Sequence, residues 1–371
     1  MTPARRQFLR NSAAGAFVAA CPALSFAQAA TPTRREFAPQ PGPWRTFEVS
    51  TRVELQDVQG AARLWLPIPS IDSDYQRSFE SSVVSNGRTR FTHDGREGAR
   101  LLHAEFDAGQ PRPFVELTTR VQTRNRAADW QRRPVVAESA DTLRFYTRAT
   151  ELLPTDGIVR STALQATRGA RTDVDKARAI YNWVVANTYR EPKVRGCGEG
   201  DIQTMLETGN LGGKCADLNA VFVGLCRAVG LPARDVYGLR LAPSEFGYKE
   251  LSGNSANLKG AQHCRAEVYL QAHGWVAVDP ADVAKVMRLE TPEWIKTTQH
   301  PVVAPVSRAL FGGWEGNWMA YNHAHDVVLP QARGPRLPFF MYPVAEHADG
   351  RFDSYAPDDF KYQISARELK A

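Results

Sequence analysis

The sequence of 371 residues contains no apolar run that approaches the roughly 20 residues of a membrane-spanning helix. It also lacks a strong excess of either charge. The net charge is +6, and three of these positive charges are Arg5, Arg6 and Arg10, which no acidic residue near the amino terminus offsets. The remainder of the chain is too weakly basic to indicate a nucleic-acid-binding surface. No internal repeat is visible. The composition, 43% hydrophobic and 23% charged, is that of a globular protein with core material for about two or three domains.

The first 29 residues have the order of an export signal. The pair Arg5–Arg6 precedes a mildly apolar stretch, which ends in the small-x-small pattern "AQA" at 27–29. The paired arginines resemble a twin-arginine signal, and we therefore predict a periplasmic protein. An alternative stays open, because "VAAC" resembles a lipoprotein box and would place a lipid anchor on Cys21.

The rest of the chain divides by its patterns. Residues 30–44 are rich in Pro and Arg and are predicted to be a linker. Residues 45–150 contain alternating runs such as "FEVSTRVELQ", separated by turn signals, and predict an antiparallel β-sandwich. Residues 155–290 mix helical and strand patterns and predict an α+β domain. Residues 291–371 are rich in aromatics, Pro and Gly, and we expect a C-terminal extension packed on that domain.

The stretch "GGKCADLNAVF" at 212–222 places a cysteine where a helix begins. Apolar residues recur at helical spacing after Cys215, so this residue is expected at the helix amino terminus. The unpaired N–H groups and the positive end of the helix dipole there stabilise a thiolate and lower the pKa of the thiol. Gly212 and Gly213 are expected to allow a tight turn and leave room for a substrate. The backbone N–H of Cys215 is a candidate donor to an oxyanion.

A second pattern supplies the partners that a nucleophilic thiol needs. The segment "HCRAEVYLQAHGWVAVDP" at 263–280 alternates on both sides of "AHG" and predicts a hairpin. A register that pairs odd with odd residues brings His263 and Asp279 together on one face. Asp279 would then orient His263, and His263 would exchange a proton with Cys215.

Four cysteines lie beyond the export signal, and an even number permits disulfides in an oxidising compartment. Cys226 lies inside the predicted helix, and Cys264 points away from the His263 face, so both are expected in the core. Cys197 lies in a Gly-rich loop, and a reversible disulfide with Cys215 is left open.

The segments "GGKCADLNAVFVGLCRAVGLPARDVYGLRL" and "HCRAEVYLQAHGWVAVDPADV" together resemble the transglutaminase-like superfamily, over about residues 155–290. The resemblance implies a papain-like α+β core and a Cys-His-Asp triad. By position, Cys215 would be the nucleophile, His263 the general base and acid, and Asp279 the orienting group.

The resemblance also implies an aromatic side chain upstream of the cysteine that helps to hold the oxyanion. Tyr189 is the candidate, with Gln203 as its rival, and plain packing or a surface position is the alternative for either residue. Arg265 departs from the family pattern, which usually has an aromatic residue there. If Arg265 lines the cleft it would hold a substrate carboxylate, and a pair with Glu267 or a solvated position is the alternative. Nothing resembles the family's calcium-binding loop, so neither a metal nor a cofactor is expected.

These residues together predict acyl transfer on an amide or peptide bond through a cysteine thioester. Release by water gives a peptidase or amidase, and release by an amine gives a protein-crosslinking transglutaminase. We favour hydrolysis, because water is abundant in the periplasm and the sequence shows no recognisable binding site for an acceptor amine. The alternative from another class is a non-catalytic binding or scaffold protein with this fold. Peptides, proteins and peptidoglycan peptides all fit as substrates. Nucleic acid is not expected as a partner. The sequence does not indicate the oligomeric state.

Overall fold

The computed structural model describes residues 36–131 and 137–370, and these described residues belong to one compact unit. The predicted export signal, including Cys21, and the first part of the predicted linker lie outside the described residues. Among the residues that are described, no helix combines the length and the apolar character needed to cross a membrane.

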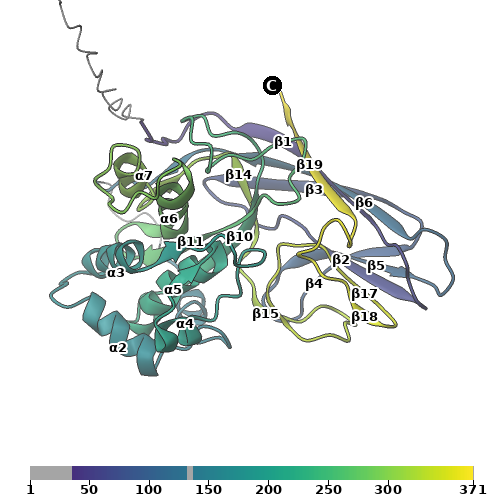
Figure 1. The fold of residues 1–371 in the computed structure, drawn as a ribbon, viewed down its shortest axis with the longest axis horizontal. Helices are drawn as coiled ribbons and strands as arrows, with labels where there is room; N and C mark the ends of the chain where they lie inside the picture. Colours follow the sequence, from purple (N-terminus) through teal and green to yellow (C-terminus); the bar gives the residue numbers. More distant parts are fainter. Residues whose placement is uncertain (1–35, 132–136, 371) are drawn as a thin grey trace, which may run out of the picture. The chain divides into compact units, whose positions relative to one another are not determined.

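Two antiparallel sheets form the predicted β-sandwich (Figure 1). The strand order is β19-β1-β6-β3 in one sheet and β18-β17-β2-β5-β4 in the other. Alternation in the sequence explains the arrangement: in β1, Phe47, Val49 and Val53 are buried, while the residues between them are more exposed. Side chains of both sheets share one apolar core. The strands contributed by the amino-terminal half are β1 (Arg45–Glu54), β2 (Ala62–Pro67), β3 (Gln76–Ser85), β4 (Arg88–His93), β5 (Arg100–Phe106) and β6 (Phe114–Thr123).

The C-terminal segment completes the sandwich, which the sequence did not predict. β19 (Tyr362–Leu369) pairs with β1 along most of its length, and Figure 1 shows this last, yellow strand beside the purple first strand. β17 (Val344–His347) pairs with β2 and with β18 (Gly350–Arg351). We expected 291–371 to pack on the domain at 155–290, and its first part does so: apolar residues between Ile295 and Trp314 share the core of that domain, and β14 (Trp318–Asn322) pairs with β10.

Residues 155–290 form the predicted α+β domain. Helix α5 (Cys215–Ala228) is buried along its whole length and contacts β10 (Ala233–Arg240) and β11 (Gln262–Leu270) of a four-stranded sheet with the order β12-β11-β10-β14. β12 (Gly274–Val278) completes the predicted hairpin with β11. The remaining helices are α1 (Ala140–Phe145), α2 (Gly157–Ala166), α3 (Asp173–Asn187), α4 (Ile202–Thr208), α6 (Pro280–Leu289) and α7 (Ala304–Ala309), and the remaining short strands are β7 (Arg126–Ala127), β8 (Tyr189–Arg190), β9 (Gly212–Gly213), β13 (Gly313–Trp314), β15 (His325–Val327) and β16 (Leu337–Phe339).

Candidate active site

Cys215 is the first residue of α5, and a carboxylate explains why the helix begins there. Asp217 accepts the backbone N–H of Lys214 at 2.8 Å and those of Glu199 and Gly200 at 2.9 Å. It therefore caps the helix from the third position and ties the Gly-rich loop to it. Among the described residues, the backbone N–H of Cys215 donates no hydrogen bond. This donor, at the positive end of the helix, is available to an oxyanion.

The two glycines before Cys215 are required by close packing. A Cβ on Gly212 would lie 2.5 Å from the ring of Tyr189, and a Cβ on Gly213 would lie 2.6 Å from the Cβ of Asp217. We expected these glycines to serve the turn and the substrate. In the structure, Gly212 and Gly213 instead allow β8 and β9 to pair closely beside the start of α5.

His263 and Asp279 meet as the predicted register requires. Glu267 pairs with Ala277 across the hairpin, which confirms the odd-with-odd register. The Nε2 atom of His263 lies 2.8 Å from Oδ2 of Asp279, and both side chains are buried. Asp279 follows β12 and caps α6, where it accepts the backbone N–H of Asp282 at 3.0 Å. Its position is therefore fixed by a helix start as well as by the hairpin.

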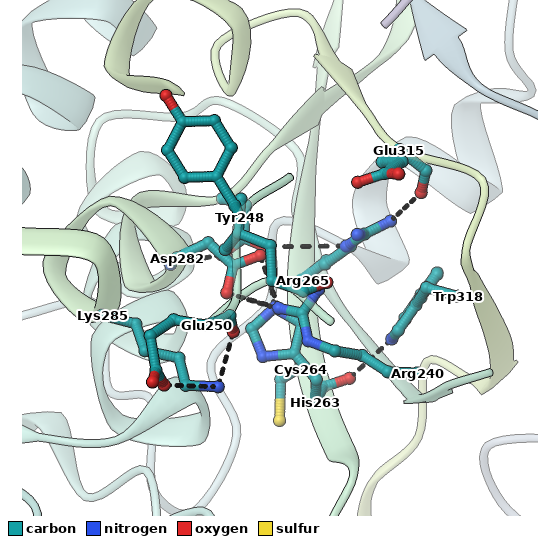
Figure 2. Close-up of polar contacts among 12 residues, drawn as sticks. Arg240, Tyr248, Glu250, His263, Cys264, Arg265, Asp282, Lys285, Glu315 and Trp318 are labelled. Carbon is teal, nitrogen blue, oxygen red and sulfur yellow. Dashed lines mark hydrogen bonds and ion pairs between the residues drawn. The ribbon is translucent and has the colours of Figure 1, made fainter. Parts of the chain in front are cut away.

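A second carboxylate, which the sequence analysis missed, contacts the same imidazole. Oδ1 of Asp282 lies 3.3 Å from Nε2 of His263, and its Oδ2 accepts from Arg240 at 2.6 Å (Figure 2). Burial lowers the pKa of His263 and Arg240 lowers it further, but Asp282 and Asp279 outweigh both and raise it to about 9. The signal for this residue was its place three positions after Asp279, on the first turn of a helix.

Replacing Asp282 with asparagine is expected to lower the pKa of His263 from about 9, because it removes one of the two anions that stabilise the imidazolium. NMR titration of the His263 imidazole measures the change. The matched control is Asp173→Asn, which removes an exposed carboxylate paired with Lys176 on α3. An imidazole that titrates at the same pH in Asp282→Asn and in the unmodified protein would contradict the assignment.

Three sulfur atoms lie together at the start of α5. Those of Cys197, Cys215 and Cys264 are all within 4.8 Å of one another, and the Tyr342 hydroxyl donates to Cys197 Sγ at 3.1 Å. Burial raises the pKa of the Cys215 thiol, but hydrogen bonds from Cys197, Cys264 and His263 bring it well below the usual value. The pKa values of Cys197 and Cys264 are raised. Cys215 is therefore the thiol that ionises first.

All four cysteines of the described residues are free. Cys226 and Cys264 are fully buried, as predicted. Strand alternation did not show, however, that the sulfur of Cys264 lies next to those of Cys215 and Cys197. The sulfur distances leave the Cys197–Cys215 disulfide an open prediction.

Arg265 does not line the cleft, so the expected carboxylate clamp does not hold. Its side chain is buried, and its guanidinium lies 4.5 Å from the ring centre of Trp318 and donates to the carbonyl of Glu315 at 3.0 Å (Figure 2). Its Nε is 3.6 Å from Oδ2 of Asp279, so its positive charge supports the carboxylate behind His263. The alternative pair with Glu267 is also absent among the described residues, because other arginines occupy that carboxylate.

The structure brings neither candidate for the second oxyanion donor to Cys215. Tyr189 packs against Gly212 and lies 5.7 Å, between ring centres, from Trp294. Gln203 is exposed on α4 and donates to Glu207 at 2.7 Å. Helical and strand patterns locate such residues along the chain, but they do not show which way each side chain points.

Cys215 and His263 line a cavity of about 600 Å³, a size typical of small-molecule and peptide sites. Tyr342 and Tyr355 also line it. Asn254, which lines it too, is exposed, so the cavity communicates with solvent.

The site has the three parts of a papain-like cysteine enzyme: a thiol at a helix start, an imidazole on a strand, and a carboxylate behind the imidazole. The profile of the transglutaminase-like superfamily matches residues 160–280. A protein of Haemophilus influenzae, named only as uncharacterized, is 35% identical over 328 residues, which cover 84% of this chain and 87% of that protein. The chain belongs to the transglutaminase-like superfamily, and its fold supports a papain-like cysteine enzyme.

Two solved structures are more distant. One, from Cytophaga hutchinsonii and titled "a Putative Cysteine Protease", is 15% identical, with a TM-score of 0.49 over 88% of this chain and 99% of that chain. The other, the periplasmic domain of TgpA from Pseudomonas aeruginosa, is 13% identical, with a TM-score of 0.34 over 72% of this chain and 93% of that chain.

Proposed function

We propose that the protein hydrolyses an amide or peptide bond through a thioester on Cys215. The observation that supports this is the placement of Cys215 and His263 in one solvent-open cavity, with Asp279 in contact with His263 and with His263 lowering the pKa of the Cys215 thiol. Asp279 and Asp282 hold the imidazolium form of His263, and this imidazolium stabilises the thiolate.

The reaction follows from these positions. The thiolate of Cys215 attacks the carbonyl carbon, and the backbone N–H of Cys215 donates to the oxyanion that forms. The C–N bond breaks as His263 gives its proton to the leaving amine. Water then attacks the thioester and gives a proton to His263, and the C–S bond breaks to release the acid. Because Asp279 holds Nε2, Nδ1 is the ring nitrogen available for these transfers.

A crosslinking transglutaminase would use an amine in place of water. Hydrolysis is the better proposal, because none of the described residues that line the cavity carries a carboxylate that would attract a lysine ammonium. Water has access through the solvent-open side of the cavity. A non-catalytic scaffold is the remaining alternative, and the following experiment separates it from an enzyme.

Alkylation by iodoacetamide is expected to modify Cys215 selectively, with an apparent pKa below that of ordinary cysteine, because His263 and two thiols stabilise its thiolate. Peptide mapping after a pH series of timed reactions measures the rate at each cysteine. Cys226 is the internal control, since burial raises the pKa of its thiol. Reaction of Cys215 at the rate of Cys226 would support the scaffold.

We also propose that the protein is exported to the periplasm. Mass spectrometry of the chain recovered from its own cells is expected to show a mature amino terminus at Ala30, after the "AQA" pattern. A lipid-modified terminus at Cys21 would establish the lipoprotein alternative. An uncleaved chain in the cytoplasmic fraction would contradict both.

A further inference from the structure

Among the residues that the structure describes, the cavity that contains Cys215 is lined by several lysines and arginines and by no acidic side chain. Three of these lysines and arginines have a carboxylate partner. Arg240 pairs with Asp282 at 2.6 Å, Lys259 with Asp358 at 2.5 Å, and Lys285 with Glu250 at 3.5 Å; Figure 2 shows the first and the third of these pairs. The lysines and arginines among the lining residues are Arg190, Lys214, Arg240, Lys259 and Lys285.

The other two cations have no such partner. Within the described ranges 36–131 and 137–370, the side chains of Arg190 and Lys214 make no hydrogen bond or ion pair, and the Nε of Arg190 is buried without one. The two charges also repel each other: burial lowers the pKa of Lys214 most, Arg190 lowers it further, and the smaller attractions of Cys197, Cys215 and Asp217 do not offset both. An unpaired charge in a partly buried site carries a desolvation cost that an anionic ligand would offset.

Arg190 and Lys214 lie close to Cys215 in the fold. Lys214 immediately precedes Cys215. Arg190 pairs with Gly213 in the parallel contact between β8 and β9, so its backbone lies beside the same loop. Both side chains line the same cavity as Cys215, so an anion held by both would lie in that cavity beside a carbonyl bound at the Cys215 sulfur.

A third polar group in the cavity is also unsatisfied. Gln262 precedes His263, its side chain is buried, and neither its amide nitrogen nor its amide oxygen has a partner among the described residues. An amide side chain offers donors and an acceptor. A peptide group, which has one of each, would satisfy both ends, and buried polar groups are usually satisfied.

We propose that the cavity recognises a peptide that carries a carboxylate next to the scissile bond, with Arg190 and Lys214 holding the carboxylate and Gln262 holding a neighbouring peptide group. The guanidinium of Arg190 matches the two oxygens of a carboxylate. The inference rests on the proposed function, because it names the substrate class for the same site. The carboxylate could belong to an acidic side chain or to the peptide's own C-terminus, and the second experiment below distinguishes them.

Two alkylating reagents of nearly the same shape test the anion site without a known substrate. Iodoacetate carries a carboxylate and iodoacetamide does not, so the ratio of their rates at Cys215 reports attraction of the anion. We expect Arg190→Gln to lower this ratio about tenfold, and Lys214→Gln to lower it as well. The second variant keeps the backbone N–H that Asp217 accepts. Lys259→Gln is the matched control, because it removes a cation that Asp358 already neutralises, and its ratio should stay near that of the unmodified protein.

The outcomes separate the two proposals. Selective reaction of Cys215 with iodoacetamide, together with an unchanged ratio in both Arg190→Gln and Lys214→Gln, would overturn the anion site and leave the hydrolase standing. Failure of both reagents to select Cys215 over Cys226 would overturn the hydrolase itself.

Matched peptides then identify the source of the carboxylate. One pair differs by Glu or Gln beside the cleaved bond, and a second pair differs by a free or an amidated C-terminus one residue beyond it. We expect about tenfold higher kcat/KM for the acidic member of one pair, and loss of that preference in Arg190→Gln. Equal turnover of both members in both pairs would overturn the proposal.

Discussion

Turnover is expected to fall by about 10⁵-fold or more when Cys215 is replaced with alanine, because the sulfur is the atom that forms the thioester. The fold should persist. Alanine removes only the thiol, and Asp217 still caps the helix through the backbone N–H of Lys214. The rate of amide hydrolysis by the purified variant, together with its thermal unfolding curve, measures both effects.

The control for this variant is Cys226→Ala. It removes a buried thiol on the same helix, away from the cavity, and should retain turnover while losing about 1 kcal/mol of stability. Full activity in Cys215→Ala would rule out the thioester mechanism.

The second large effect is expected at His263. Replacement with alanine removes the proton donor for the leaving amine and should lower the rate by about 10⁴-fold. It should also raise the pKa of the Cys215 thiol, since the hydrogen bond and the charge of His263 are among the causes that lower it. The acid limb of the pH–rate profile for alkylation would then move to higher pH, because a higher pH is needed to form the thiolate.

His93→Ala provides the matched control for this variant, as His93 is exposed on β4 of the sandwich. Its alkylation profile should equal that of the unmodified protein. An unchanged thiol pKa in His263→Ala would show that the hydrogen bonds from Cys197 and Cys264 alone hold the thiolate, and it would remove His263 from the proposed ion pair.

The surroundings of His263 show why its charge is stable in a buried place. Two carboxylates, Asp279 and Asp282, face its Nε2 atom, and two guanidiniums lie behind them, Arg240 on Asp282 and Arg265 near Asp279. A buried charge is costly unless it is paired, and this cluster pairs each of its members. Removing any one of these charged side chains should therefore both shift the pKa of the His263 imidazole and destabilise the fold.

The parts of the site that local patterns define were predictable. Apolar spacing placed Cys215 at the start of a helix, and the period of two in the hairpin placed His263 and Asp279 on one face. Both predictions concern residues whose position follows from a helix end or a strand register. The α+β class followed from the same patterns and from the family resemblance.

Features of the fold and site that depend on contacts between distant helices, strands and loops were not predictable from the sequence. The alternation in β19 predicts a strand but not its pairing with β1, more than 300 residues earlier in the sequence. Arg265 has the residue type of a substrate clamp, yet the packing of Trp318 places it behind Asp279. The neighbourhood of Cys197 and Cys264 likewise depends on where a Gly-rich loop and a strand come together.

The sequence by itself determined that Cys215 begins a helix and that His263 and Asp279 share one face of a hairpin, because each of these features follows from the spacing of about ten to twenty neighbouring residues. Only the tertiary structure decided which charges surround them. Arg240 and Asp282 neutralise each other, whereas Arg190 and Lys214 have no carboxylate partner among the residues that the structure describes. Pairing of charges depends on distances across the fold, and those distances are set by the packing of sheets and helices that lie far apart in the chain.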